Sequence, residues 1–236
     1  KVRMVLAAKQ QNYKEVEINP GFGQAAIFRL SGQRQLPVLV DGENIISDSS
    51  AIVRYLEKLN PEPKLIPEDP TDKAMVHLIE DWADTTMAKA TRVALINAAA
   101  RDASLRVALL PDEVPIPFQK LIKDLPLQIL SDLSVLMTPN EETSLITSLH
   151  ALSHLIKSNQ WLVGQSMSLA DIAVAPQLSL LRFPKSAGPE LEGKGCPRFS
   201  NDPRLSILFD WRDQLETLLM EFETSEISKA ENNDLN

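Results

Sequence analysis

The sequence contains little cysteine, no excess of positive charge and no long apolar run. Cys196 is the one cysteine among 236 residues, so no disulfide can form within the chain. The formal net charge of -8 does not fit the basic surface that nucleic-acid-binding proteins usually carry. No apolar run approaches the roughly 20 residues of a membrane-spanning helix, and the charged first residues do not resemble a secretory signal. We therefore expect a cytoplasmic protein that binds neither nucleic acid nor membrane.

Several catalytic signatures are also absent, among them a Gly-rich phosphate loop and a Gly-x-Ser-x-Gly nucleophile turn. His150 and His154 are four residues apart and would share a helix face, as two metal ligands do, but no third ligand is spaced to join them. We interpret both as surface histidines and predict no metal site. Cys196 has Arg198 nearby but neither a histidine partner nor a helix N-terminus, so we interpret it as an unreactive thiol.

The first sixty residues predict a mixture of helices and strands. Residues 1–9 place apolar side chains and Lys9 on one helical stripe, and residues 12–18 alternate polar and apolar as a half-buried strand does. A short helix is expected over 24–30. Two β-branched runs around an Asp-Gly turn, within 36–46, predict a hairpin. The Ser-Asp-Ser-Ser run that follows offers several N-caps for another helix.

The rest of the chain reads as helical. Residues 61–70 are rich in proline, which neither donates to a β-ladder nor continues a helix, so they mark a linker. We therefore predict an α/β domain over 1–60 and an all-helical domain over 71–220. Residues 221–236 are acidic and polar, and we expect them to be disordered.

One motif in the helical half predicts a helix start. Ser168-Leu169-Ala170-Asp171 has the spacing of a capping box, in which the serine caps the Asp171 N–H and the Asp171 side chain returns a bond to the serine N–H. The residues that follow are small or apolar, so this helix should be buried. The motif is predicted to serve folding rather than chemistry.

Taken together, Gln35-Leu36-Pro37-Val38-Leu39, Asp41-Gly42 and the run Ile46 to Ile52 resemble the glutathione-binding half of cytosolic glutathione transferases. The likeness is greatest to bacterial, including cyanobacterial, members. It implies a thioredoxin-like α/β N-terminal domain followed by an all-α C-terminal domain. No helix start signal precedes Lys1, so we expect the first strand of this fold to be missing; the alternative is an uncapped, frayed first helix.

The resemblance also implies where the glutathione cysteinyl unit binds. In this family the proline that matches Pro37 follows a cis peptide bond, which leaves the N–H and C=O of Leu36 free to pair with an extended peptide. Gln35 and Arg34 are candidates for further polar contacts. The alternative for Pro37 is an edge-strand proline with no ligand.

A second pair of residues is expected to hold the γ-glutamyl unit. Asp48 and Ser49 stand at the predicted start of a helix, where exposed N–H groups favour a carboxylate. Ser49 suits the γ-glutamyl carboxylate, and Asp48 could pair with the γ-glutamyl ammonium. Simple helix capping by these residues is the alternative.

The implied activity is attack of the glutathione thiolate on a hydrophobic electrophile, typical of detoxification by homodimeric enzymes. The family lowers the thiol pKa with a Tyr, Ser or Cys just before the first helix, so the catalytic residue is expected upstream of Lys1 and is unknown. Tyr13 follows that helix and is no replacement. Two alternatives stay open: a non-catalytic binding protein of the same fold, and a glutathione-dependent thiol reductase. Glutathione is the expected co-substrate, without a metal.

Overall fold

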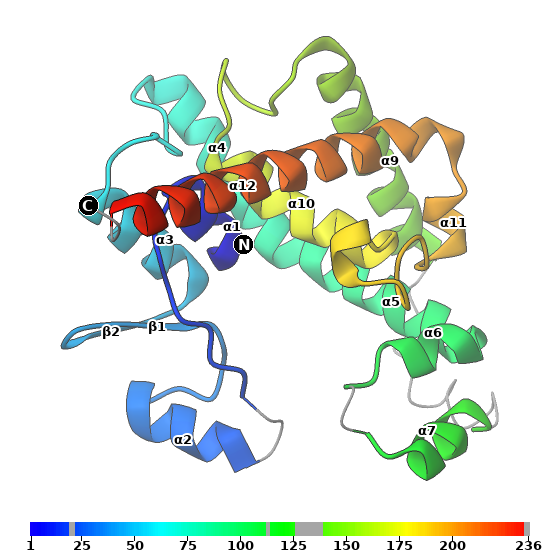
Figure 1. Ribbon diagram of the computed structural model, residues 1–236. Coiled ribbons are helices and arrows are strands. Elements are labelled where there is room, and N and C mark those ends of the chain that lie inside the picture. The colour runs from blue at the N-terminus through cyan, green and yellow to red at the C-terminus, as the bar shows by residue number, and fades with distance from the viewer. Residues whose placement is uncertain (19–21, 112–113, 126–138, 234–236) are drawn as a thin grey trace. The chain divides into compact units, whose positions relative to one another are not determined.

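The computed structural model describes residues 1–18, 22–111, 114–125 and 139–233, and the chain divides into two compact units (Figure 1). One unit comprises Lys1–Ile66 together with Glu216–Asn236, and the other comprises Pro67–Leu215. The division at Ile66 falls within the proline-rich stretch. Within the described ranges, none of the helices combines the length and the apolar character that crossing a membrane requires.

The first unit contains three helices and a hairpin before the proline-rich stretch. Their bounds are α1 Val2–Ala8, α2 Phe22–Ser31, β1 Val38–Asp41, β2 Asn44–Ser47 and α3 Ser49–Leu59. This order confirms the predicted helix at the start, the short second helix, the hairpin and the helix behind the serine-rich run. Helix α3 packs against both strands and against α1, and α2 packs against β2.

The hairpin is closed by a two-residue turn. Asp41 pairs with Asn44 across it, and Gly42 in the turn has a φ of 56°, the left-handed value that such hairpin turns require. Glycine adopts this φ without steric cost. The register that follows pairs Val38 with Ser47 at the far end of the two strands.

The core of this unit lies between α1 and α3. Val5 and Ile52 are fully buried, as are their apolar neighbours on the same helix faces. Lys9 is also buried, with its ammonium paired to Glu57 and donating to the Pro63 carbonyl at 2.7 Å. Glu57 in turn accepts a hydrogen bond from the Leu65 N–H at 3.2 Å, so the pair fixes the proline-rich stretch to the core.

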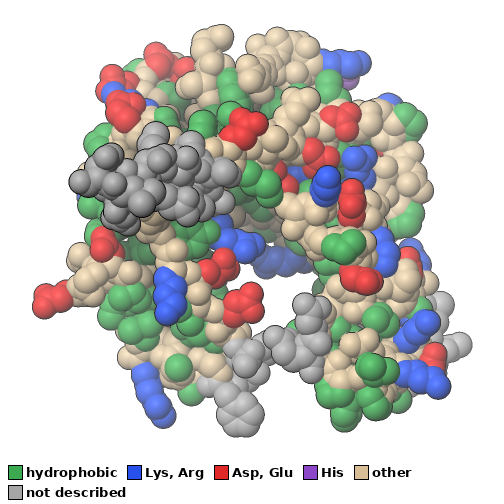
Figure 2. Space-filling view, in the orientation of Figure 1, with side chains coloured by type: hydrophobic (Ala, Val, Ile, Leu, Met, Phe, Trp, Pro, Cys, Tyr) green, Lys and Arg blue, Asp and Glu red, His purple; other side chains and the backbone are tan. Residues whose placement is uncertain are grey.

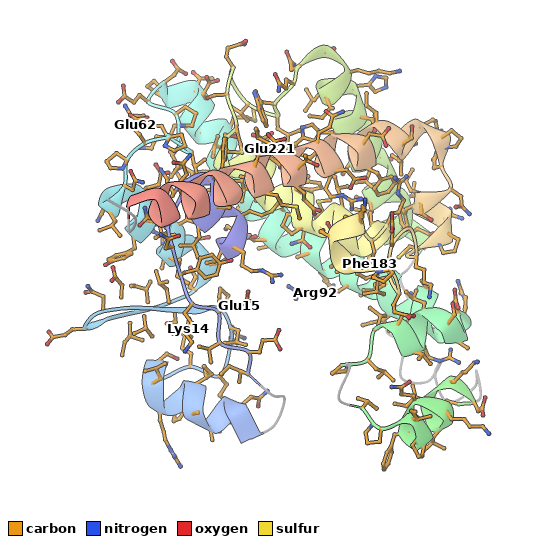
Figure 3. The ribbon with its side chains drawn as sticks, in the orientation of Figure 1. Lys14, Glu15, Glu62, Arg92, Phe183 and Glu221 are labelled. Carbon is orange, nitrogen blue, oxygen red and sulfur yellow. The ribbon has the colours of Figure 1, made fainter. Side chains whose placement is uncertain are left out.

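The predicted strand over residues 12–18 is wrong. This segment has no regular secondary structure, and its side chains are exposed through residue 17; Figure 3 shows Lys14 and Glu15 on it. A strand exists only where a neighbouring strand satisfies its backbone groups. In the described part of the chain, the sheet has two strands, β1 and β2, and neither pairs with this segment.

The second unit is helical, as predicted. Its elements are α4 Pro70–Trp82, a π-helical turn Ala83–Met87, α5 Ala88–Arg101, α6 Ala103–Ala108, α7 Ile116–Lys123, α9 Pro139–Ser158, α10 Leu169–Leu181, a 3-10 turn Lys185–Ala187, α11 Pro197–Ser200 and a 3-10 turn Pro203–Leu205. Helix α12, Ser206–Asn233, begins in this unit.

Helix α10 forms the centre of this unit. It packs against α4, the π-helical turn and α5, and most of its side chains are buried from Leu169 to Leu181. A helix buried on all sides is apolar all round, which the sequence pattern after Asp171 predicted. By contrast, α7 leaves Ile116, Phe118 and Leu121 exposed, and Figure 2 shows hydrophobic side chains gathered over this helix.

The chain crosses itself closely just after α10. Arg182 forms an isolated antiparallel bridge with Gly195, and the Phe183 N–H donates to the Lys194 carbonyl at 2.8 Å (Figure 3). A Cβ atom at Gly195 would lie 2.2 Å from the carbonyl oxygen of Leu181. Real Cβ atoms do not approach a backbone oxygen this closely, so the crossing requires glycine.

Helix α12 continues to Asn233, so it includes residues 221–233 of the segment that was expected to be disordered, and residues 234–236 lie outside the described residues. The sequence from 221 to 233 contains neither proline nor glycine, and its Glu, Lys and Ala residues are good helix formers. An acidic composition therefore did not prevent the preceding helix from extending.

Candidate functional site

The hairpin register brings the expected glutathione-binding residues to one end of the sheet. Val38 lies opposite Ser47, and paired Cα atoms in antiparallel strands are about 4.5–5.5 Å apart. Pro37 precedes Val38 and Asp48 follows Ser47, so both lie just beyond this pair. Leu36 and Ser49 are the next residues outward. Two segments that are ten residues apart in the sequence are therefore neighbours at the start of α3.

The backbone at Leu36 is outside the β-ladder. The Leu36–Pro37 peptide bond is cis, as the family resemblance implied, and strand pairing begins only at Val38. The side chains of Leu36 and Gln35 are exposed. Arg34 instead places its guanidinium over the ring of Phe28, 5.7 Å from the ring centre.

Asp48 caps helix α3. Its Oδ1 accepts a hydrogen bond from the Ala51 N–H at 2.9 Å, which is the capping role that was the alternative for this residue. Its φ of 82° is unusual for a residue with a side chain. Within the described ranges Oδ2 has no protein partner. One carboxylate oxygen is thus used by the helix and the other faces outward from an exposed residue.

The first turn of α3 has a positive character. Its leading N–H groups lack partners within the helix, and the helix dipole adds a partial positive charge at this end. The Lys1 ammonium donates to the hydroxyl of Ser50, the residue after Ser49, at 3.1 Å. This lysine was missed in the sequence, since nothing in a local pattern relates residues 1 and 50. The arrangement suits a carboxylate next to Ser49.

The Tyr55 hydroxyl has a structural role. Its hydroxyl donates to Asp41 Oδ2 at 2.6 Å, which joins α3 to the hairpin turn. The hydrogen bond to Asp41 is the main reason why the pKa of Tyr55 is raised. A phenol whose proton is held in this way is a poor donor to a thiolate.

The capping box in the helical half is confirmed. Asp171 Oδ2 accepts from both the N–H and the hydroxyl of Ser168 at 2.8 Å, and both halves of the box are present. Asp171 Oδ1 also accepts from the Leu162 N–H at 2.8 Å, a contact the sequence did not predict. Asp171 is fully buried, and burial raises its pKa to about 6.

The other candidate groups are not assembled for catalysis. The Cys196 thiol is buried, its Sγ lies 3.6 Å from the Leu180 carbonyl oxygen, and burial raises its pKa to about 12. His150 Nε2 lies 3.4 Å from Asp202 Oδ2. In the part of the chain that the structure describes, no three His, Cys, Asp or Glu residues are grouped as metal ligands.

Two family models match the sequence. Residues 1–64 match the glutathione S-transferase N-terminal domain, and residues 137–197 match the glutathione S-transferase C-terminal domain. The first match contains the hairpin end, and the second contains the capping box.

The chain is also similar to curated relatives and to a solved structure. Maleylacetoacetate isomerase of Rattus norvegicus is 28% identical over 187 residues, covering 76% of this chain and 71% of that protein. FtsZ-localized protein A of Caulobacter vibrioides is 24% identical over 186 residues, covering 77% and 72%. The crystal structure of a glutathione S-transferase from Rhodospirillum rubrum has a TM-score of 0.56 at 24% identity, covering 89% of this chain and 79% of that one. The expected fold is confirmed.

Proposed function

Because this chain belongs to the glutathione S-transferase family, we propose that it is a glutathione-dependent enzyme that directs the glutathione thiolate at a small electrophile. The observation that carries this proposal is the hairpin register, which sets Leu36–Pro37 beside Asp48–Ser49. These residues match the family's binding segments, and the Leu36 backbone, Asp48 and Ser49 offer polar groups suited to different parts of glutathione.

Glutathione is an extended peptide with charged ends. The Leu36 backbone, outside the ladder, would pair with the cysteinyl unit as an added strand. The Ser49 hydroxyl and the first N–H groups of α3 would hold the γ-glutamyl carboxylate, with the Lys1 charge nearby. Asp48 Oδ2 would accept from the γ-glutamyl ammonium while Oδ1 keeps the helix cap. Gln35 would make a further polar contact.

The reaction itself is either conjugation or isomerisation. In both, the thiolate adds to an electrophilic carbon; conjugation keeps the new C–S bond, and isomerisation breaks it again after rotation about a former double bond. The similarity to maleylacetoacetate isomerases supports isomerisation of an unsaturated acid. Conjugation of a hydrophobic electrophile, and with it a part in detoxification, would use the same glutathione-binding residues.

We also propose that the enzyme is cytoplasmic and that it forms a homodimer. Light scattering would test the homodimer.

A binding role without catalysis is the second candidate. The observation in its favour is the similarity to FtsZ-localized protein A, whose name describes a location rather than a reaction. A thiol reductase would need an accessible cysteine, which Cys196 does not supply because it is buried. Fold alone does not decide between these functions.

Calorimetric titration with glutathione tests the proposed binding site at the hairpin end. We expect saturable binding by the wild-type protein and about a tenfold loss for Ser49→Ala, the cost of one hydrogen bond to a charged group. Ser104→Ala is the matched control, since Ser104 also lies in the first turn of an Asp-capped helix, α6. Equal affinities for all three proteins would refute the proposed role of Ser49 in glutathione binding.

Activity assays then separate the candidates. A protein that binds glutathione and isomerises maleylacetoacetate is the proposed isomerase, and one that conjugates chlorodinitrobenzene is a transferase. Binding of glutathione without turnover of either compound would support the non-catalytic role instead. No binding of glutathione by the wild-type protein would overturn the proposed function.

A further inference from the structure

One arginine of helix α6 joins the ends of two other helices. Arg106 Nη1 donates to the carbonyl oxygens of Ala99 at 2.9 Å and Ala100 at 2.7 Å, in the last turn of α5. Its Nε donates to the Ile122 carbonyl oxygen at 3.3 Å and its Nη2 to that of Lys123 at 2.9 Å, in the last turn of α7. Backbone carbonyls at two helix C-termini thus take four of the five N–H donors of a guanidinium.

The charge of Arg106 is balanced by these helix ends. Among the residues that the structure describes, no carboxylate pairs with it. A helix C-terminus carries about half a unit of negative charge, so two of them offset one guanidinium. The planar fork of donors is what allows a single side chain to bond to both helices at once.

Capping of α5 alone would be a simpler role for Arg106. Capping accounts for the bonds to Ala99 and Ala100, which lie seven and six residues before it. It does not account for the bonds to Ile122 and Lys123, which lie 16 and 17 residues after it and belong to another helix. Arg106 therefore attaches α7 to the rest of the second unit.

Helix α7 has few other attachments. None of its side chains is buried in the described structure, although most helices in folded domains are held by a buried apolar face. It packs against α6, which in turn packs against α5 (Figure 1). Gln119 donates to the Val114 carbonyl oxygen at 2.8 Å, a bond within the same segment. In the described ranges, the side-chain hydrogen bonds that join α7 to another helix come from Arg106.

We propose that α7 detaches and unfolds while the rest of the second unit stays folded, and that the bonds from Arg106 determine how often this happens. A helix of eight residues is at best marginally stable in water, so α7 loses its helical structure once it leaves α6. Detachment uncovers Ile122, which is half-buried, near Phe118 and Leu121, which are already exposed. It therefore enlarges an apolar surface that other molecules can reach, and it involves none of the residues assigned to glutathione.

Hydrogen–deuterium exchange of the full chain at several low urea concentrations, followed by mass spectrometry, tests the proposal. Amides of α7 should exchange at a rate that low urea leaves unchanged, because a local opening exposes little surface. Amides of α10, at the centre of the unit, should exchange more slowly and at a rate that rises with urea. The same rate and the same urea dependence in both helices would overturn the proposal, because α7 would then open only when the whole unit unfolds.

Arg106→Met should accelerate exchange in α7 by at least about tenfold more than in α10, since charged hydrogen bonds to α7 are lost. Arg101→Met is the matched control, because it removes the same charge at an exposed residue of α5 and should change exchange in α7 by less than about twofold. Wild-type exchange in α7 of Arg106→Met would refute the role of Arg106. Equal acceleration in α7 and α10 would refute it too, since Arg106 would then stabilise the unit as a whole.

Discussion

The Lys9 ammonium is buried against the Glu57 carboxylate, with the Pro63 carbonyl oxygen as a further acceptor. A buried ammonium is stable only when paired and hydrogen-bonded. Lys9 lies at the end of α1 and Glu57 on α3, so the pair joins these helices to the proline-rich stretch. Without the lysine, the partly exposed Glu57 carboxylate would lose its cationic partner and the Pro63 carbonyl would lose its donor.

Lys9→Met is therefore expected to lower the free energy of unfolding by about 2–4 kcal/mol, less than a fully buried pair because Glu57 is partly exposed. Urea unfolding followed by circular dichroism measures this. Lys14→Met is the matched control, because Lys14 is exposed in the same unit and should change stability by less than about 0.5 kcal/mol. Similar losses for both variants would contradict a structural role of the pair.

Removal of the Asp171 side chain should destabilise the helical unit. Asp171→Ala leaves the N–H groups of Leu162 and Ser168 buried without acceptors, so we expect a loss of at least about 2 kcal/mol. Asp210→Ala, at an exposed position of α12, should stay within about 0.5 kcal/mol of wild type. An unchanged melting temperature for Asp171→Ala would show that the capping box contributes nothing.

The same carboxyl gives a pH dependence with a definite sign. Burial raises the pKa of Asp171 from 3.8 to about 6, so between those values the folded protein binds more protons than the unfolded chain. The stabilisation that comes from protonation of Asp171 is therefore fully present below about pH 4 and is lost as the pH rises through about 6, by roughly 3 kcal/mol. Urea unfolding at several pH values should show wild type losing stability relative to Asp171→Asn across this window. If the stabilities of wild type and Asp171→Asn changed in parallel with pH, the raised pKa of Asp171 would be disproved.

Asp48→Asn separates helix capping from ligand binding. Asparagine caps a helix as well as aspartate and tolerates a positive φ, so unfolding should change by less than about 0.5 kcal/mol. If the carboxylate pairs with the γ-glutamyl ammonium, the affinity for glutathione should fall about tenfold. The control is Asp69→Asn at the cap of α4, which should alter neither quantity. Full glutathione affinity in Asp48→Asn would restrict Asp48 to capping.

The single thiol should be protected in the folded protein. Cys196 is 3% exposed and burial raises its pKa to about 12, so almost no thiolate is present near neutral pH. Reaction with Ellman's reagent at pH 8 should be slow in buffer and fast in urea, where the same cysteine is exposed. A rapid reaction of the native protein would mean that the thiol is accessible after all.

Features set by neighbouring residues were predictable from the sequence. The Asp-Gly turn, the Ser-Asp-Ser-Ser run at the start of α3 and the Ser168–Asp171 spacing each specify structure within a few residues, and each was found as expected. The binding residues at the hairpin end were chosen by family resemblance, and the hairpin register explains how they become neighbours. Their contacts with glutathione remain a prediction.

Features that depend on distant partners were not predictable. Residues 12–18 have the alternation of a strand, but alternation does not supply the neighbour that a strand needs. The contact of Lys1 with Ser50 joins residues 49 positions apart, for which a single sequence carries no signal. Lys9 lies on the otherwise apolar helical stripe of residues 1–9. A charged residue in that position was the one sign in the sequence of a buried ion pair.

Gly195 has a consequence for how this sequence can change over time. A side chain there would force apart two backbone segments that are joined by hydrogen bonds on both sides of the crossing, at Phe183 and at Cys196. In the loop between the two segments, Gly188 and Gly193 have open space around them, and their restriction is a positive φ rather than a close contact. Insertions and deletions should therefore accumulate in the loop, while the crossing glycine stays fixed. When divergent relatives are aligned, Gly195 is the position from which the loop lengths should be counted.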